Sequence, residues 1–170
     1  DFLISSGTTY NPGNNWTVFN GSGSQALTVD LASPLNLNKF KIDKPTGTTL
    51  QLQGSQNTIN IADSVMIYDA TFNDNGKTVN VAQSIYHSGI HTGTGKIVLN
   101  SINDQDINGD GSGIFENLEL NKPNNGNAEV ILNSNVTIDG TLSFTGSPSG
   151  YKLLNIDQYN MRLGVDATVS

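Results

Sequence analysis

The segment KFKID, residues 39–43, alternates apolar and charged side chains with a period of two. This alternation is typical of a β-strand with one buried face, because successive side chains point to opposite sides of a strand. The same spacing recurs at short intervals in the pairs Leu50/Leu52, Ile59/Ile61, Val65/Ile67, Val79/Val81, Ile97/Leu99, Leu118/Leu120, Val130/Leu132 and Val136/Ile138. Turn-forming stretches such as 73–76 and 93–95 separate the pairs. The sequence therefore predicts many short strands joined by tight turns.

Two architectures fit short strands at this spacing: tandem small β-sandwiches, and a β-helix in which each coil stacks on its neighbours. Residues 37–45 resemble residues 115–123, and residues 21–27 resemble residues 93–99, which suggests an internal repeat of about 21–86 and 93–165. Sandwich domains of that size would be small and would normally have longer strands. We therefore predict one all-β, right-handed parallel β-helix of about seven coils over residues 1–170, with tandem small β-sandwiches as the alternative.

Two further expectations concern how the coils stack and where they end. Asn-rich turns favour the β-helix, because stacked Asn side chains can hydrogen-bond along a ladder of equivalent turns. The ends of a β-helix are open sheet edges, so we expect the segment to belong to a longer chain. Trp16 is interpreted as a cover over one open end.

Several stretches also resemble a known family. Residues 72–79, 91–100, 107–111 and 115–123 are similar to the repeats of large Bacteroidetes surface proteins. This resemblance implies a β-helical stalk in an adhesin exported by the type 9 secretion system, located outside the cell on its surface. It implies no catalytic residues, because the family pattern consists of core and turn positions. The C-terminal sorting domain of that family is not evident in the chain.

Composition argues against several functions. The net charge of −7 and the pI near 4.4, with only eight Lys and Arg residues, argue against nucleic-acid binding. No apolar run is long enough to predict insertion into a membrane. The absence of Cys excludes a disulfide framework and thiol catalysis. Only 14% of residues are charged, so the polar surface is rich in hydroxyl and amide groups.

One motif suggests a metal. Asp106, Asn108 and Asp110 alternate before a glycine, as in the first half of an EF-hand-type calcium loop. The position that should supply a bidentate acid is Asn117, with Glu116 one place early. The stretch also coincides with a glycine-rich turn of the repeat, so an ordinary turn is the favoured interpretation. We expect no cofactor, and calcium at these three residues is the open alternative.

Other chemistry-bearing residues have simpler interpretations. His87 and His91 are four apart, but the turns around them make a helix improbable, so we expect two exposed histidines rather than zinc ligands. Asp104 and Asp106 have the spacing of a glycosidase pair if that stretch is extended. The single arginine, Arg162, is far from them along the chain, and the aromatic residues are scattered. We expect no enzyme activity.

Ser64 follows Asp63 and precedes an apolar residue, which resembles the Bacteroidetes signal for O-glycosylation. We predict it as a glycan attachment site if the source is such a bacterium. The expected function is a structural and adhesive stalk segment. Its expected partners are neighbouring domains of the same chain, surface glycans or the secretion machinery. A polysaccharide-binding or polysaccharide-degrading β-helix, a calcium-stabilised module and a phage fibre segment remain alternatives.

Overall fold

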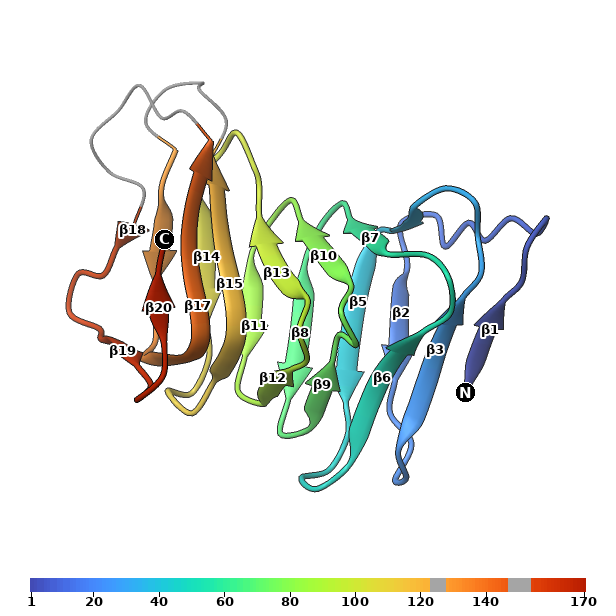
Figure 1. Cartoon of the computed structure of the whole chain (residues 1–170), viewed down its shortest axis with the longest axis horizontal. Helices are drawn as coiled ribbons and strands as arrows, with labels where there is room; N and C mark the ends of the chain where they lie inside the picture. The colour runs from blue at the N-terminus through green and yellow to red at the C-terminus, as the bar shows by residue number, and fades with distance from the viewer. Residues whose placement is uncertain (123–127, 147–153) are drawn as a thin grey trace.

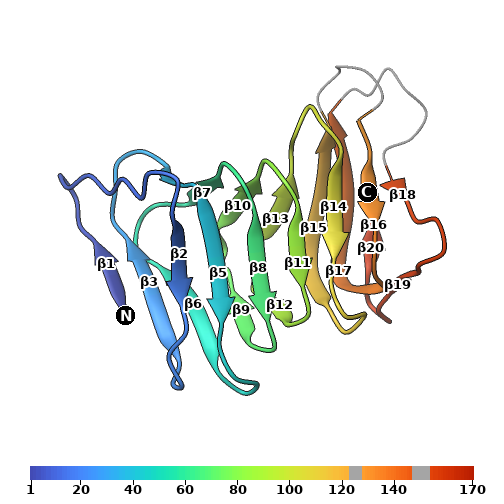
Figure 2. The same cartoon turned by 180° about the vertical axis from the view of Figure 1, so that it is seen from behind.

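The strands wind into a right-handed parallel β-helix, which confirms the predicted fold (Figures 1 and 2). The computed structural model describes residues 1–122, 128–146 and 154–170. These described residues form twenty strands and no helix. Accordingly, no helix that could cross a bilayer occurs in this part of the chain. About six turns advance from the N-terminal end to the C-terminal end, rather than the seven that we expected.

The strands stack into three parallel ladders, one on each side of the coil. The first ladder contains β1 (Phe2–Ile4), β3 (Gln25–Val29), β6 (Thr49–Gln53), β9 (Thr71–Asn73), β12 (Ile90–Thr92), the beginnings of β15 (Ile114–Lys122) and β17 (Val136–Gly146), and β19 (Met161–Leu163). The second contains β4 (Leu35–Leu37), β7 (Thr58–Ile61), β10 (Thr78–Val81), β13 (Lys96–Leu99), the ends of β15 and β17, and β20 (Thr168–Val169). The third contains β2 (Trp16–Phe19), β5 (Lys39–Asp43), β8 (Val65–Tyr68), β11 (Ile85–His87), β14 (Gln105–Asn108), β16 (Val130–Leu132) and β18 (Leu154–Asn155).

We call the bend between the first and second ladders the first corner, that between the second and third the second corner, and that between the third and first the third corner. The two similar sequence segments do not occupy equivalent places in this frame. Phe40 lies in the third ladder, opposite Val65, whereas Leu118 lies in the second ladder, opposite Ile97. Their likeness therefore reflects similar strand and turn chemistry rather than a shared position in the coil.

The inward positions of the three ladders form one continuous apolar core. Buried Ile, Leu, Val and Phe side chains line it from Ile4 in the first coil to Leu142 near the last. Phe19, Phe40 and Phe72 pack edge to face, with ring centroids 6.0 and 6.1 Å apart. Each coil thus buries its apolar face only against its neighbours, which is how a β-helix gains stability.

Three buried lysines hold the corners together. Lys44 Nζ, at the third corner, donates to the carbonyl oxygens of Gly21 and Gly23, at 2.7 and 2.6 Å. Lys77, at the first corner, and Lys122, at the second, use carbonyl oxygens of the preceding coil in the same way. Burial lowers the pKa of Lys122 to about 8. Each ammonium therefore satisfies carbonyl groups that the corner would otherwise leave unpaired.

An asparagine ladder also forms, but mainly on strands rather than in turns. Asn60 lies between Asn36 and Asn80 on the outer side of the second ladder. Its side chain donates to Asn36 Oδ1 at 2.9 Å and accepts from Asn80 Nδ2 at 2.9 Å. At the third corner, the backbone N–H and the side-chain Nδ2 of Asn160 both donate to Asn135 Oδ1, so these turns contain one stacked pair of asparagines instead of a longer row. The expected amide stacking is thus present, and its main run follows the strand register.

Trp16 lies at the predicted end of the stack but points outward. It belongs to β2, the first strand of the third ladder, and is 37% exposed. Lys39 Nζ lies 5.7 Å from its ring centroid, so the ring packs along the outer face. The open edge of β2 is therefore not covered by this side chain.

Candidate functional site

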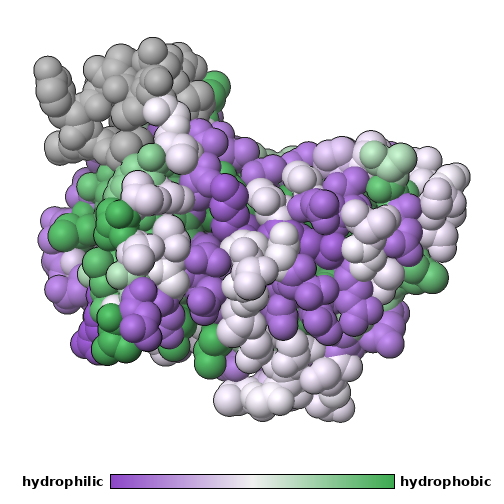
Figure 3. Space-filling model, in the orientation of Figure 1, coloured by the Kyte–Doolittle hydropathy of each residue, from purple (hydrophilic) through white to green (hydrophobic). Residues whose placement is uncertain are grey.

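A polar trough crosses the outer face of the second ladder, over β10, β13, β15 and β17. Its volume is about 520 Å³. It is lined by Gly76, Thr78, Thr94, Gly95, Lys96, Asn117, Glu119, Thr141, Ser143, Thr145 and Ser170. In Figure 3 the surface over the middle of the molecule is mostly hydrophilic, whereas hydrophobic residues gather toward the C-terminal end. The trough is therefore a hollow with hydroxyl, amide and charged groups on its walls.

Strand register places the trough side chains in rows along the axis of the β-helix. Thr78 on β10 lies opposite Lys96 on β13. Asn117 and Glu119 on β15 lie opposite Thr141 and Ser143 on β17. These residues face outward because their strand neighbours Val79, Ile97, Leu118 and Leu142 occupy the core. The alternation that builds the core thus also sets the spacing of the polar groups.

An ion pair lies at the centre of the trough. Lys96 Nζ donates to Glu119 Oε2, and Thr145 Oγ1 donates to Glu119 Oε1. The Glu119 side chain is only 7% exposed, whereas that of Lys96 is 44% exposed. Burial by itself raises the pKa of Glu119, but the hydrogen bonds from Lys96 and Thr145 outweigh it and hold the pKa below its usual value. Glu119 is therefore a fixed carboxylate acceptor at neutral pH.

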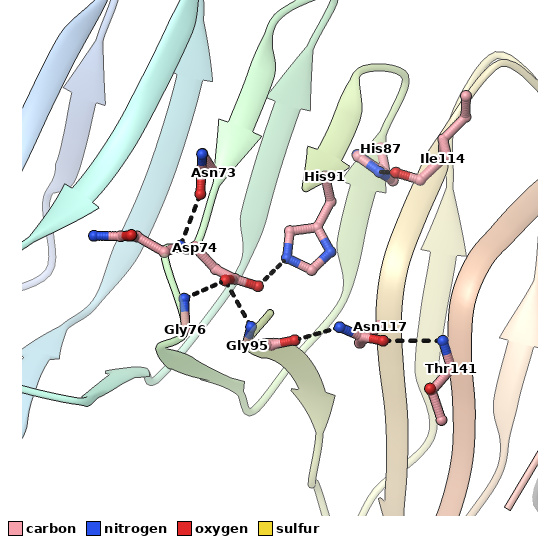
Figure 4. A network of polar contacts seen from close by, with 10 residues as sticks. Asn73, Asp74, Gly76, His87, His91, Gly95, Ile114, Asn117 and Thr141 are labelled. Atoms are coloured by element: carbon pink, nitrogen blue, oxygen red, sulfur yellow. Dashed lines mark hydrogen bonds and ion pairs between the residues drawn. The ribbon is translucent and has the colours of Figure 1, made fainter. Parts of the chain in front are cut away.

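A buried polar network fixes the first corner, which forms one wall of the trough (Figure 4). Asp74 Oδ1 accepts the backbone N–H groups of Gly76 and Gly95, each at 2.8 Å. Its Oδ2 accepts from His91 Nε2 at 2.8 Å, with both side chains fully buried. This network ties the corners of two successive coils to one carboxylate.

Asn117 extends the same connection by two more coils. Its Nδ2 donates to the Gly95 carbonyl oxygen at 2.7 Å, and its Oδ1 accepts the Thr141 backbone N–H at 2.9 Å. Both ends of this amide are therefore held by backbone groups. Hydrogen bonds therefore connect the trough wall continuously from Gly76 to Thr141.

The histidines are buried, and the expectation that they would be exposed is wrong. His87 lies opposite Ile67 in the third ladder, and His91 lies opposite Phe72 in the first, both at inward positions. His87 Nε2 donates to the Ile114 carbonyl oxygen at 2.7 Å. Burial lowers the pKa of His87 to about 4, so this imidazole is neutral near pH 7. Strand alternation, not a helical spacing, places both rings in the core.

The three residues of the calcium motif divide between two environments. Asp106 and Asn108 project outward from β14, and both accept from Asn133 Nδ2, at 3.0 and 3.2 Å. Asp110 lies in the following turn, where it accepts from the backbone N–H of Ser112 at 2.9 Å. Hydrogen bonds from Ser112 lower the pKa of Asp110. In the part of the chain that the structure describes, no cluster of three or more His, Cys, Asp or Glu side chains forms. Calcium binding at these residues stays the untested alternative to an ordinary turn.

The other predicted residues lie away from the trough. Asp104 precedes β14 and accepts the Glu129 backbone N–H at 2.8 Å, while Asp106 accepts from Ser84 Oγ at 3.2 Å. Ser64 is half-buried at the second corner and donates to Asp63 Oδ1 at 2.7 Å. Its glycosylation stays a prediction.

The comparisons with known proteins add no assignment: no protein-family model, curated protein or solved structure matches the chain significantly.

Proposed function

We propose that this chain is a structural and adhesive stalk segment of an exported bacterial surface protein, without catalytic activity. The observation that carries the proposal is the unbroken parallel stack, in which every coil pairs with the next along one axis. The seven strands of the third ladder, spaced about 4.8 Å apart, give this segment an axial length of about 30 Å. Such a stack can be lengthened simply by adding coils, which suits a spacer.

The surface chemistry supports the adhesive part of the proposal. The outward groups of the second ladder are mostly hydroxyls and amides, including the ladder of Asn36, Asn60 and Asn80 and the trough side chains. Many individually weak polar contacts along a rod add up when they act together. Partners on this interpretation are cell-surface glycans and neighbouring domains of the same chain.

The chemistry of the trough supports a binding role rather than a catalytic one. Glu119 is the only side chain with a carboxylate among the trough residues that the structure describes, and it is engaged by Lys96 and Thr145. Hydrolysis of a glycosidic bond needs two carboxyl groups on either side of that bond. Asp104 and Asp106 accept from groups of neighbouring coils instead.

The location is tested by labelling intact and permeabilised cells of the source organism with antibodies raised against the chain. We expect equal labelling of intact and permeabilised cells, because the segment is exposed on the surface. Labelling that requires permeabilisation would contradict the proposed location. Release of reducing ends from a panel of polysaccharides by the purified chain would contradict the non-catalytic part, and a trimer in sedimentation equilibrium would favour a phage fibre.

A further inference from the structure

We propose that the trough across β10, β13, β15 and β17 binds a short stretch of a neutral oligosaccharide. This inference deepens the proposed adhesive function by assigning it to one site and one class of ligand. The volume of about 520 Å³ falls within the range of roughly 300–1,000 Å³ that is usual for ligand sites.

The functional groups of the trough match those of a sugar. Thr78 and Ser143 carry hydroxyls that can both donate and accept a hydrogen bond, whereas Thr145, which donates its proton to Glu119, can still accept one. Asn117 adds an amide with one donor and one acceptor site beyond those already used. Sugar hydroxyls are likewise donors and acceptors. The methyl groups of the threonines supply small apolar surfaces for the C–H faces of a pyranose ring.

The charges in the trough favour a ligand without net charge. Lys96 and Glu119 neutralise each other within the site. An anionic group would be attracted by Lys96 but repelled by Glu119, and the reverse holds for a cation. A pair of neighbouring hydroxyls can instead accept from the ammonium and donate to the carboxylate. Hydrogen bonds to ionised groups are stronger than those between neutral ones.

The site is also arranged before the ligand arrives. Glu119 is held by Lys96 and Thr145, and Asn117 is held at both ends of its amide. The Asp74 network fixes the corner backbone beside them. A site that is already ordered loses little conformational entropy on binding, which raises affinity for a polar ligand.

The dimensions set the orientation and length of the ligand. The trough crosses four strands, so its rows of groups extend over about 14 Å along the axis at the usual strand spacing. The distance between neighbouring strands, about 4.8 Å, is close to the length of one pyranose unit in an extended sugar chain. The ligand is therefore a run of about three sugar units lying parallel to the axis, across the strands.

The test is isothermal titration calorimetry of the purified chain with cellotriose, xylotriose, mannotriose and chitotriose. Each trisaccharide is compared with the monosaccharide from which it is built. We expect binding of at least one trisaccharide and at least tenfold weaker binding of its monosaccharide. Thr78→Trp fills one end of the trough and should weaken binding at least tenfold. The matched control is Thr71→Trp, a half-buried outward position on β9 in the first ladder, which should leave the affinity unchanged within twofold.

Two results would overturn the inference. One is the absence of binding to all four trisaccharides at millimolar concentration. The other is equal weakening by Thr78→Trp and Thr71→Trp with both variants folded, as judged by circular dichroism. If none of the four neutral trisaccharides binds, titration with trigalacturonate tests for an anionic ligand, and binding that is lost in Lys96→Gln would assign one to the trough. Surface labelling of cells is unaffected by any of these outcomes, so the stalk proposal is tested separately.

Discussion

At the scale of single residues, His87 is a neutral imidazole inside an apolar core. Its pKa in the folded protein is about 4, because burial disfavours the charged ring, whereas an exposed histidine titrates near 6.5. The unfolded chain therefore binds more protons than the folded one between pH 6.5 and 4. The free energy of unfolding should fall as the pH falls through this window, by about 3 kcal/mol in total from this group.

Urea unfolding of wild type and His87→Gln at pH 7, 5.5 and 4 measures this contribution. Gln keeps a donor near the Ile114 carbonyl but does not titrate. We expect the variant to lose less stability than wild type on acidification, by about 3 kcal/mol. An identical pH dependence in the two proteins would show that His87 is not the buried group responsible.

Asp74 is the second residue whose chemistry the structure makes testable. Its carboxylate accepts three N–H donors while fully buried, so Asp74→Asn would set an amide N–H₂ against one or more of them. We expect a loss of about 3 kcal/mol in the free energy of unfolding, measured by urea denaturation.

Asp69→Asn is the control for this substitution. Asp69 is exposed and has a φ of 50°, a conformation that Asn tolerates well. Asp69→Asn should change the free energy of unfolding by no more than about 0.5 kcal/mol. If Asp69→Asn and Asp74→Asn lowered the free energy of unfolding equally, the hydrogen bonds of Asp74 would contribute nothing beyond the effect of removing one negative charge.

The burial of the histidines illustrates which residue features were accessible from the sequence. Ile85 and His87 already have the two-residue spacing of inward positions, so this burial had a signal in the strand pattern. The hydrogen-bond partners of the two imidazole rings had no such signal in the sequence. Asp74 lies seventeen residues before His91, and their contact exists only because the coils stack.

At the scale of elements, the first corner requires glycine at position 95. A Cβ atom there would lie 2.0 Å from the Lys77 carbonyl oxygen and 2.8 Å from Asp74 Oδ1. Gly95→Ala must therefore push the corners of two coils apart. We expect a loss of about 3 kcal/mol or more in the free energy of unfolding, together with weaker saccharide binding.

Gly23→Ala is the matched control, because a Cβ at that exposed glycine meets nothing within 4 Å. Its effect should be within about 0.5 kcal/mol. If Gly95→Ala proved equally mild, the corner would be free to widen and the trough wall would not be rigid.

The strands themselves were largely predictable, whereas their assignment to ladders was not. Pairs such as Val79/Val81 and Ile97/Leu99 are inward positions, as their alternation indicated. Corner loops of different length shift each strand along the coil, so a sequence likeness such as that of residues 37–45 and 115–123 joins strands of different ladders. Strand alternation is a local property, but ladder position depends on all preceding loop lengths.

At the scale of the whole molecule, stability should decline toward the C-terminal end. β19 and β20 bury little surface, and Leu163, Val165 and Val169 are exposed there. The central coils around β8 and β10 bury every inward side chain. In a stack where each coil contacts only its neighbours, the terminal coil opens first.

Hydrogen–deuterium exchange followed by mass spectrometry measures this gradient. We expect the amides of residues 161–169 to exchange at least about tenfold faster than those of residues 65–81, since each 1.4 kcal/mol of local stability is worth a factor of ten. Uniform protection along the chain would show that all coils unfold as one cooperative unit.

The amino-acid sequence by itself favoured a parallel β-helix over tandem small β-sandwiches, and it determined that the chain forms short strands with one buried face each. These properties follow from side-chain alternation and turn chemistry, which act over a few residues. Only the tertiary structure decided which outward side chains become neighbours. Lys96 and Glu119, twenty-three residues apart, form the ion pair of the trough because one turn of the coil brings them side by side. The candidate site is thus a property of the stacking register, which no local pattern encodes.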